Sequence, residues 1–241
     1  MTHFSPSQLG DFAIWYLGFL ISITFHEYAH ALSAFRGGDR TAYHGGQLTL
    51  DPTPHIRRAP FGMVLIPVLT FFSSGWMMGW ASTPYDPSWG RRYPKRQALM
   101  SLAGPLSNFA LAFVALVILR VLLASGVFVP PAALSFSHLV SAPDSDSPGS
   151  ILAALGMFLS IMLNLNILLG LFNLIPLPPL DGAGVVEGFG PKAVVRFYEM
   201  LANNSMAQII GLLVAWKIFS YISGPAFSLV IKLVYPDLTY T

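Results

Sequence analysis

Four long apolar stretches constrain the fold of this chain more than any other feature of its sequence. They cover residues 12–35, 97–123, 151–174 and 206–234. A helix needs about 20 apolar residues to cross the hydrocarbon core of a bilayer, so each stretch can span a membrane. Only 10% of the residues are charged, against about 25% in a typical soluble domain. We therefore predict an all-α polytopic membrane protein with about four spanning helices, folded as one membrane-embedded domain over residues 1–241.

A fifth apolar segment, residues 61–81, has spanning length but contains Pro67 and three glycines. Arginines lie on both of its flanks, at positions 57–58 and 91–92. Because basic loops stay in the cytoplasm, a full crossing would put these flanks on opposite sides. We expect 61–81 to be re-entrant or buried against the other helices, where irregular backbone is tolerated. Near residues 43–50, where Gly45-Gly46 precedes Gln-Leu-Thr-Leu, we expect a short β-hairpin.

The basic residues also predict the orientation of the chain. Lysine and arginine cluster after the first apolar stretch, before the second and after the third, whereas residues 125–150 contain neither. The three basic segments are therefore expected on the cytoplasmic side. No basic patch is dense enough to indicate nucleic-acid binding. The chain has no cysteine, so any metal must be bound by histidines and carboxylates.

The first apolar stretch contains the motif His26-Glu27-Tyr28-Ala29-His30. Residues four apart lie on one face of a helix, so both imidazoles can bind one metal ion with Glu27 close by. A charged residue at membrane depth costs about 2.5–3.5 kcal/mol, which favours a functional role. The alternative is structural: the histidines would hydrogen-bond to neighbouring helices, with Glu27 as their partner.

A catalytic zinc ion takes three protein ligands and keeps one position for water. Asp181 is the best remaining donor, at the end of the segment Asn173-Leu-Ile-Pro-Leu-Pro-Pro-Leu-Asp181. The three prolines exclude regular helix and predict extended backbone. Because the first and third stretches both run towards the cytoplasm, Asp181 is expected at a depth similar to that of the histidines. The alternative is that Asp181 caps the helix that follows it.

Three motifs in this order resemble the site-2 protease family of intramembrane zinc metalloproteases. They are His26-Glu27-x-x-His30, the segment 103–108 (Ala-Gly-Pro-Leu-Ser-Asn) and Asn173-x-x-Pro-x-Pro-x-Leu-Asp181-Gly. Residues 79–87 are similar to a Gly-Trp-Ala-x-Pro segment of a compact bacterial subgroup, but Tyr85 and Asp86 interrupt the pattern.

The resemblance implies a compact bacterial-type member without PDZ or CBS domains. It implies one zinc ion per chain bound by His26, His30 and Asp181, with Glu27 activating water and Asn173 polarising the substrate carbonyl or binding the oxyanion. It also implies a transmembrane protein or peptide substrate and a location in the bacterial inner membrane, with the active site towards the cytoplasm.

Two functions remain open on the sequence. The first is an intramembrane zinc metalloprotease that hydrolyses peptide bonds in or near transmembrane segments. The second is a non-proteolytic zinc-binding membrane scaffold or metal transporter, since transporters also place histidines and acids in their helices. Transporters often have paired halves, which this sequence does not show, and a transporter has no specific use for Glu27 between two ligands.

Overall fold

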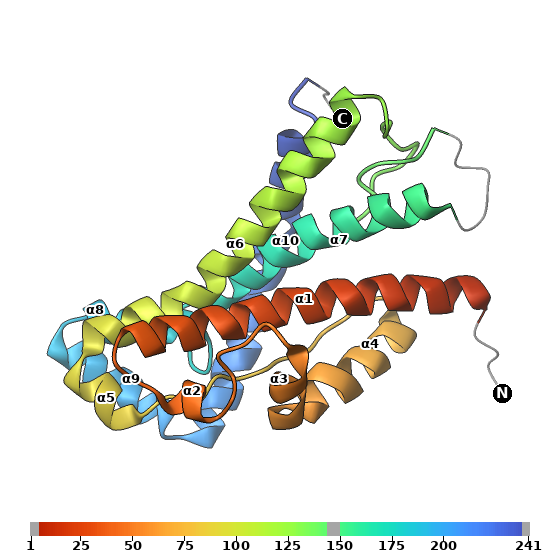
Figure 1. The fold of residues 1–241 in the computed structure, drawn as a ribbon. Helices are drawn as coiled ribbons and strands as arrows, with labels where there is room; N and C mark the ends of the chain where they lie inside the picture. The colour runs from red at the N-terminus through yellow and green to blue at the C-terminus, as the bar shows by residue number, and fades with distance from the viewer. Residues whose placement is uncertain (1–4, 144–149, 238–241) are drawn as a thin grey trace.

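The computed structural model describes residues 5–143 and 150–237, and these residues are mostly helical, without strands. The elements are α1 (Pro6–Arg36), α2 (Thr41–His44), α3 (Pro52–Arg58), the π-helix η1 (Phe61–Leu65), α4 (Ile66–Ser74), α5 (Pro87–Arg92), α6 (Pro94–Ala124), α7 (Ile151–Asn173), α8 (Asp181–Phe189), α9 (Lys192–Ala202) and α10 (Ser205–Val234). Helices α1 and α7 run in the same direction, and α6 runs against them (Figure 1).

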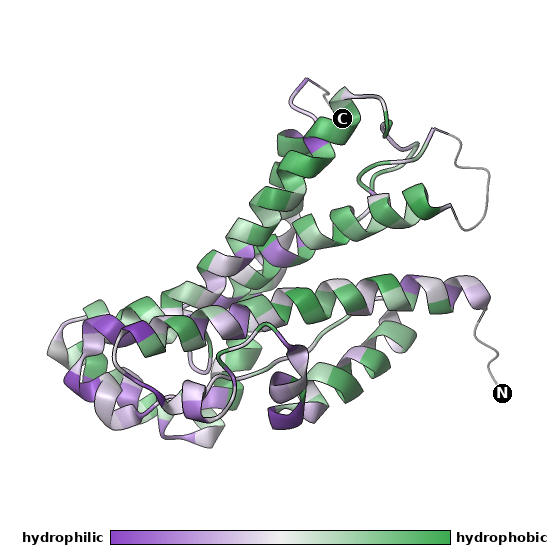
Figure 2. Ribbon diagram, viewed as in Figure 1, coloured by the Kyte–Doolittle hydropathy of each residue, from purple (hydrophilic) through white to green (hydrophobic). Residues whose placement is uncertain are grey.

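In the described ranges, four helices are long and apolar enough to cross a bilayer: α1, α6, α7 and α10, with 31, 31, 23 and 30 residues. At 1.5 Å per residue even α7 is about 35 Å long, which exceeds the hydrocarbon thickness of about 30 Å. Hydrophilic residues gather at the end of the molecule formed by α2, α5 and the C-terminal end of α1 (Figure 2). The predicted all-α multi-pass membrane protein is confirmed.

Helix α6 forms the centre of the fold, because it packs against α1, α7 and α8. Its contact with α8 is close: a Cβ atom at Gly184 would collide with Ser101, and one at Gly188 with Ala98. Small residues let helix backbones approach each other in a membrane protein. This contact fixes α8, and therefore Asp181 at its start, against α6.

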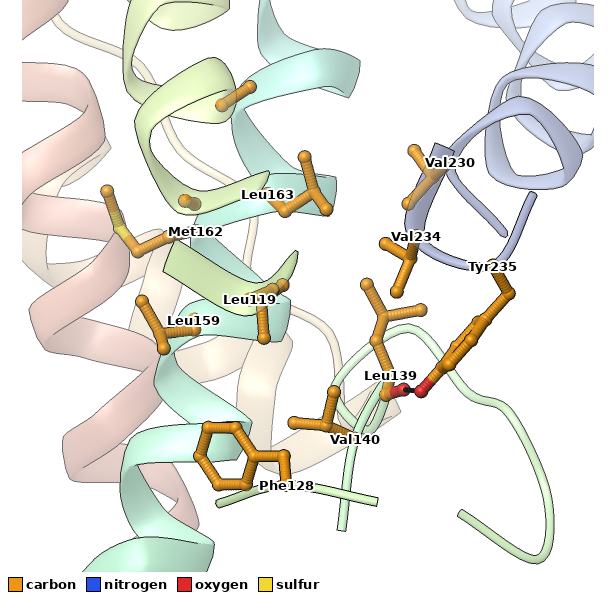
Figure 3. Close-up of a cluster of buried hydrophobic side chains, with 12 residues drawn as sticks. Leu119, Phe128, Leu139, Val140, Leu159, Met162, Leu163, Val230, Val234 and Tyr235 are labelled. Carbon is orange, nitrogen blue, oxygen red and sulfur yellow. Dashed lines mark hydrogen bonds between the residues drawn. The ribbon is translucent and has the colours of Figure 1, made fainter. Parts of the chain in front are cut away.

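A second region of packing lies at the opposite end of α6, where the chain after Ala124 folds back over α6, α7 and α10. Val129 and Ser141 form an isolated antiparallel bridge in this segment. The Tyr235 hydroxyl donates a hydrogen bond of 2.6 Å to the carbonyl oxygen of Leu139. Figure 3 shows the buried side chains that surround this bond, among them Leu119, Phe128, Val140, Leu159, Leu163, Val230 and Val234.

The segment 61–81 turns back on itself, so that its two ends lie next to each other. Its helical part ends at Gly75, which has the left-handed φ of 69°, and the backbone then runs back without regular structure. On the return the Trp80 N–H donates to the Gly62 carbonyl oxygen at 3.1 Å, and a Cβ atom at Gly62 would collide with Trp80. Arg58, just before the segment, donates from Nε to the Ser82 carbonyl oxygen at 3.0 Å. This path is that of a re-entrant segment; its position in a bilayer stays a prediction.

The β-hairpin expected near residues 43–50 is wrong. Residues 41–44 form the single helical turn α2, followed by a turn at Gly45-Gly46. Asp39 Oδ1 accepts hydrogen bonds from the N–H and hydroxyl of Thr41, at 2.9 and 2.6 Å, which favours the helical turn over a strand. Burial alone would raise the pKa of Asp39, but the hydrogen bonds from Thr41 and the Asp86 N–H outweigh it and lower this pKa.

The segment between α7 and α8 also differs from expectation. Its prolines do exclude helix, but the chain forms consecutive tight turns instead of extended backbone. The Leu177 N–H donates to the Ile175 carbonyl at 2.8 Å, and the Leu180 N–H donates to the Leu177 carbonyl at 2.9 Å. These turns bring α8 back towards the bundle directly after the end of α7.

Candidate metal centre

Helix α1 holds the motif, with its two histidines against α6 and its glutamate against the segment that contains Thr83. His26, Glu27 and His30 are 7%, 4% and 6% exposed. The Nε2 atoms of the two histidines lie 3.0 Å apart, so one ion could contact both. The i, i+4 spacing on a regular helix produces this arrangement, as the sequence predicts.

Asp181 is the first residue of α8 and completes the cluster. Its Oδ2 lies 3.0 Å from His26 Nε2, and its Oδ1 lies 3.3 Å from His30 Nε2. Among the residues that the structure describes, His26, His30 and Asp181 form the group able to hold a metal ion, with one ligand atom from each lying within 4.8 Å of the others. Histidines 44 and 55 are not part of this group.

The hydrogen bonds of the imidazoles fix which nitrogens can bind metal. His26 Nδ1 lies 2.7 Å from Asn108 Oδ1, and His30 Nδ1 lies 2.7 Å from the Met100 carbonyl oxygen. Both partners are acceptors, so each Nδ1 carries a proton, and Nε2 is the nitrogen of each ring that is left to bind metal. Asp181 Oδ2 is buried and, apart from the nearby His26 imidazole, has no hydrogen-bond partner among the residues that the structure describes. Two imidazole Nε2 atoms and a carboxylate thus converge on one point, a donor set that fits zinc.

Gly104 keeps the space beside the cluster clear. It lies on α6 directly beside the imidazoles, and a Cβ atom at this position would collide with Nε2 of both His30 and His26. The glycine therefore allows α6 to approach the metal ligands closely. This contact gives a physical reason for the glycine in the 103–108 motif.

Glu27 is held by a residue that the sequence analysis missed. The Thr83 hydroxyl lies 2.7 Å from Glu27 Oε2 and 2.9 Å from the Glu27 carbonyl oxygen, so it donates to this residue. Thr83 belongs to the interrupted 79–87 segment, whose role the sequence did not define. In that segment Asp86 caps α5, accepting a 2.8 Å hydrogen bond from the Ser88 N–H.

Asn108 belongs to a fully buried polar network that joins α1, α6 and α7. Ser22, Asn108 and Asn166 are all 0% exposed. Asn108 Nδ2 donates to Asn166 Oδ1 at 2.8 Å, and Asn166 Nδ2 donates to Ser22 Oγ at 2.8 Å. The role of Asn108 was missed, although its position four residues after Gly104 already places the two on one face of a helix.

Asn173 lies at the C-terminal end of α7 and is half-buried. Its Nδ2 donates a 3.0 Å hydrogen bond to the Leu169 carbonyl oxygen of its own helix. A role for Asn173 towards substrate therefore stays a prediction.

A spanning helix with a buried His-Glu-x-x-His motif, completed by an aspartate from another element, is the arrangement of a membrane metalloprotease. Comparison with protein families agrees, since the profile described as Peptidase family M50 matches residues 14–216. The chain belongs to this family, the site-2 protease family of zinc metalloproteases.

Several bacterial relatives share the name "Putative zinc metalloprotease". YwhC of Bacillus subtilis is 35% identical over 212 residues, covering 86% of this chain and 82% of the relative. Rip2 of Mycolicibacterium smegmatis is 29% identical over 75% of this chain and 59% of its own length. Rip2 of Mycobacterium tuberculosis is 31% identical over 74% of this chain and 58% of its own length. No solved structure matches the chain.

Proposed function

We propose that the protein is an intramembrane zinc metalloprotease that hydrolyses peptide bonds in or near transmembrane segments of other membrane proteins, as in regulated intramembrane proteolysis. The observation that carries the proposal is the convergence of His26 and His30, on a spanning helix that also holds Glu27, with Asp181 at the start of α8. We place the protein, as a single domain, in the bacterial inner membrane.

Each residue of the cluster has a distinct part in this proposal. His26, His30 and Asp181 would hold the zinc, which when bound supplies a Lewis acid that lowers the pKa of water towards about 7. Glu27 would accept the proton of the attacking water and return it to the leaving amine. Thr83 donates to Oε2 of Glu27 and would orient the carboxylate for this proton transfer. Asn173 is proposed to donate a hydrogen bond to the substrate carbonyl oxygen.

The depth of the cluster supports an opening towards the cytoplasm. His30 lies six residues before the end of α1 at Arg36, which is about 9 Å along the helix axis. The basic residues at this end predict that it faces the cytoplasm. Water could therefore reach the site from that side, and a substrate helix would have to unwind locally to present its peptide bond.

The proposal is tested by comparing the membrane proteomes of cells that carry the wild type or Glu27→Gln. We expect single-span proteins or fragments to accumulate in Glu27→Gln, because proton transfer is lost while the protein remains in the membrane. Glu199→Gln on α9 makes the same chemical change at an exposed site and serves as the matched control. Identical proteomes for wild type and Glu27→Gln would favour the scaffold or transporter.

A further inference from the structure

A groove of about 620 Å³ lies between the C-terminal turns of α1 and the N-terminal turns of α6. Each of the two helices contributes an arginine, a leucine and an alanine to the groove, in this order from the helix end. From the helix ends towards the middle of the molecule, the lining includes Arg36, Leu32 and Ala29 on α1, and Arg96, Leu99 and Ala103 on α6. Ser33, Gly37 and Gly38 complete it. The groove thus has a cationic mouth, aliphatic walls and small residues at its inner end.

The spacing of these residues matches the depth profile of a phospholipid. Each alanine lies seven residues from the arginine of its helix, about 10 Å along the axis. Leu99 is 54% exposed, so the aliphatic part is open to the surroundings of a spanning helix. Figure 2 shows that this end of α1 lies in the hydrophilic part of the molecule, while the helices become hydrophobic further along.

The two guanidinium groups at the mouth have no acidic partner in the described part of the chain, where the ion pairs involve only His26 and His30 with Asp181. Arg96 is held in place: its Nη1 donates to the Gly37 carbonyl oxygen at 2.9 Å, and its guanidinium lies 4.5 Å from the centre of the Tyr93 ring. The nearby acid Asp39 is occupied by hydrogen bonds from Thr41 and Asp86.

We infer that this groove binds an anionic phospholipid, with its phosphate between Arg36 and Arg96 and an acyl chain along the leucines and alanines. Guanidinium groups suit phosphate because they present a planar fork of donors, and basic pockets between membrane helices on the cytoplasmic side bind anionic headgroups. A soluble phosphate would use the mouth but not the apolar walls, and a neutral lipid would not use the arginines.

The lipid would bridge the helix pair that forms the metal centre. Leu99 and Ala103 flank Met100, whose carbonyl oxygen accepts from His30, and Ala103 precedes Gly104 beside both imidazoles. A bound lipid would therefore stabilise the contact of α1 with α6 at the site. The inference depends on membrane insertion and not on proteolysis.

The test measures lipid binding to the intact purified protein in a neutral detergent, by native mass spectrometry and by the shift in unfolding temperature. The probes are short-chain phosphatidylglycerol, phosphatidylcholine of the same chain length, and glycerol 3-phosphate. We expect phosphatidylglycerol to bind and to raise the unfolding temperature, with its affinity at least about tenfold lower in Arg36→Gln/Arg96→Gln. Arg91→Gln/Arg92→Gln removes the same charge from exposed positions outside the groove and should retain binding.

Three results would overturn the inference: equal affinity for the two lipids, undiminished phosphatidylglycerol binding in the groove variant, or full competition by glycerol 3-phosphate, which would indicate a site for soluble anions. Should the double variant fail to fold, Arg36→Gln alone decides the question. The Arg36 side chain forms no hydrogen bond or ion pair within the described part of the chain, so its replacement removes charge without breaking such a bond.

Discussion

At the residue scale, the metal ligands of α1 depend on acceptors supplied by α6. The Met100 carbonyl oxygen and the Asn108 side-chain oxygen each accept a hydrogen bond from an imidazole Nδ1, and this leaves both Nε2 atoms directed at Asp181. Such partners of metal ligands fix the tautomer and the ring orientation. The ligands and their partners therefore form one unit, and changes in either should be measurable as zinc affinity.

Replacement of Asp181 by asparagine should lower the zinc occupancy of the purified protein. The third ligand loses its charge, and two histidines alone bind zinc more weakly than the complete set of three ligands. Elemental analysis after mild dialysis measures this directly. Asp11→Asn, at an exposed position on α1, is the control and should retain one zinc per chain. Full occupancy in Asp181→Asn would remove this residue from the proposed site.

Replacement of Asn108 by leucine should weaken zinc binding by about 10–100-fold, the usual effect of losing the partner of a metal-bound histidine. Leucine keeps the branching of the side chain, although it is larger, and His26 Nδ1 loses its acceptor. Asn108→Asp keeps an acceptor at this position and should recover much of the affinity. Competition with a chelator of known affinity gives the comparison, and an Asn108→Leu affinity equal to that of wild type would contradict this role.

Replacement of Thr83 by valine should reduce kcat while zinc occupancy stays unchanged, since the change removes only the hydroxyl that orients Glu27. A hydrogen bond to a charged group contributes about 1.5–3 kcal/mol, which corresponds to roughly 10–150-fold in rate. Thr83→Ser keeps the hydroxyl and should restore turnover. If valine and serine behave alike in a reporter cleavage assay, Thr83 does not position Glu27.

Some residues of the site could be predicted from the sequence and others could not. His26, Glu27 and His30 could be assigned because their geometry follows from helix periodicity alone. Asn108 and Thr83 could not, because their partners depend on how α6 and the 75–86 segment pack against α1. The same limit explains the wrong hairpin: alternation near Leu48 indicated a strand, but the local Asp39–Thr41 hydrogen bonds favour a helical turn.

At the scale of elements, three spanning helices extend beyond the predicted apolar stretches, whereas α7 ends one residue before its predicted end. The first prediction, 12–35, became Pro6–Arg36 because Ser5 and Gln8 form a capping box that begins the helix earlier. The length of an apolar stretch predicts such helices well, since few other backbone conformations satisfy their hydrogen bonds inside a bilayer. The turns before Asp181 are less predictable, because prolines exclude helix without selecting one turn geometry.

The re-entrant path of residues 61–81 predicts the accessibility of its flanks. Thr53 and Ser88 are both exposed, and the native chain contains no cysteine, so single cysteines at these positions can be labelled without background. A membrane-impermeant maleimide should label both from the same side, because Arg58 and Ser82 at the two ends of the segment are hydrogen-bonded. Labelling from opposite sides would make the segment a true span.

At the scale of the whole molecule, α1 and α7 run in the same direction, and the turns after α7 bring α8 to the end of α1 where the histidines lie. The positive charges predict this same end to be cytoplasmic. The helix directions and the position of the metal ligands identify the same end of the molecule as the positive charges do, although the three observations rest on different residues. The central claim that results is a hydrolytic metal centre inside a membrane protein, in which Glu27 transfers protons and does not bind the metal.

The most direct test of this claim is the cleavage of a reporter transmembrane helix by purified protein in liposomes, with a chelator control. Glu27→Gln is close in shape to the native side chain, so folding and zinc content should be retained. Cleavage should fall by about 10²–10⁴-fold, the usual contribution of general acid–base catalysis. Undiminished cleavage by Glu27→Gln with a full zinc content would contradict the account and favour the non-proteolytic alternatives.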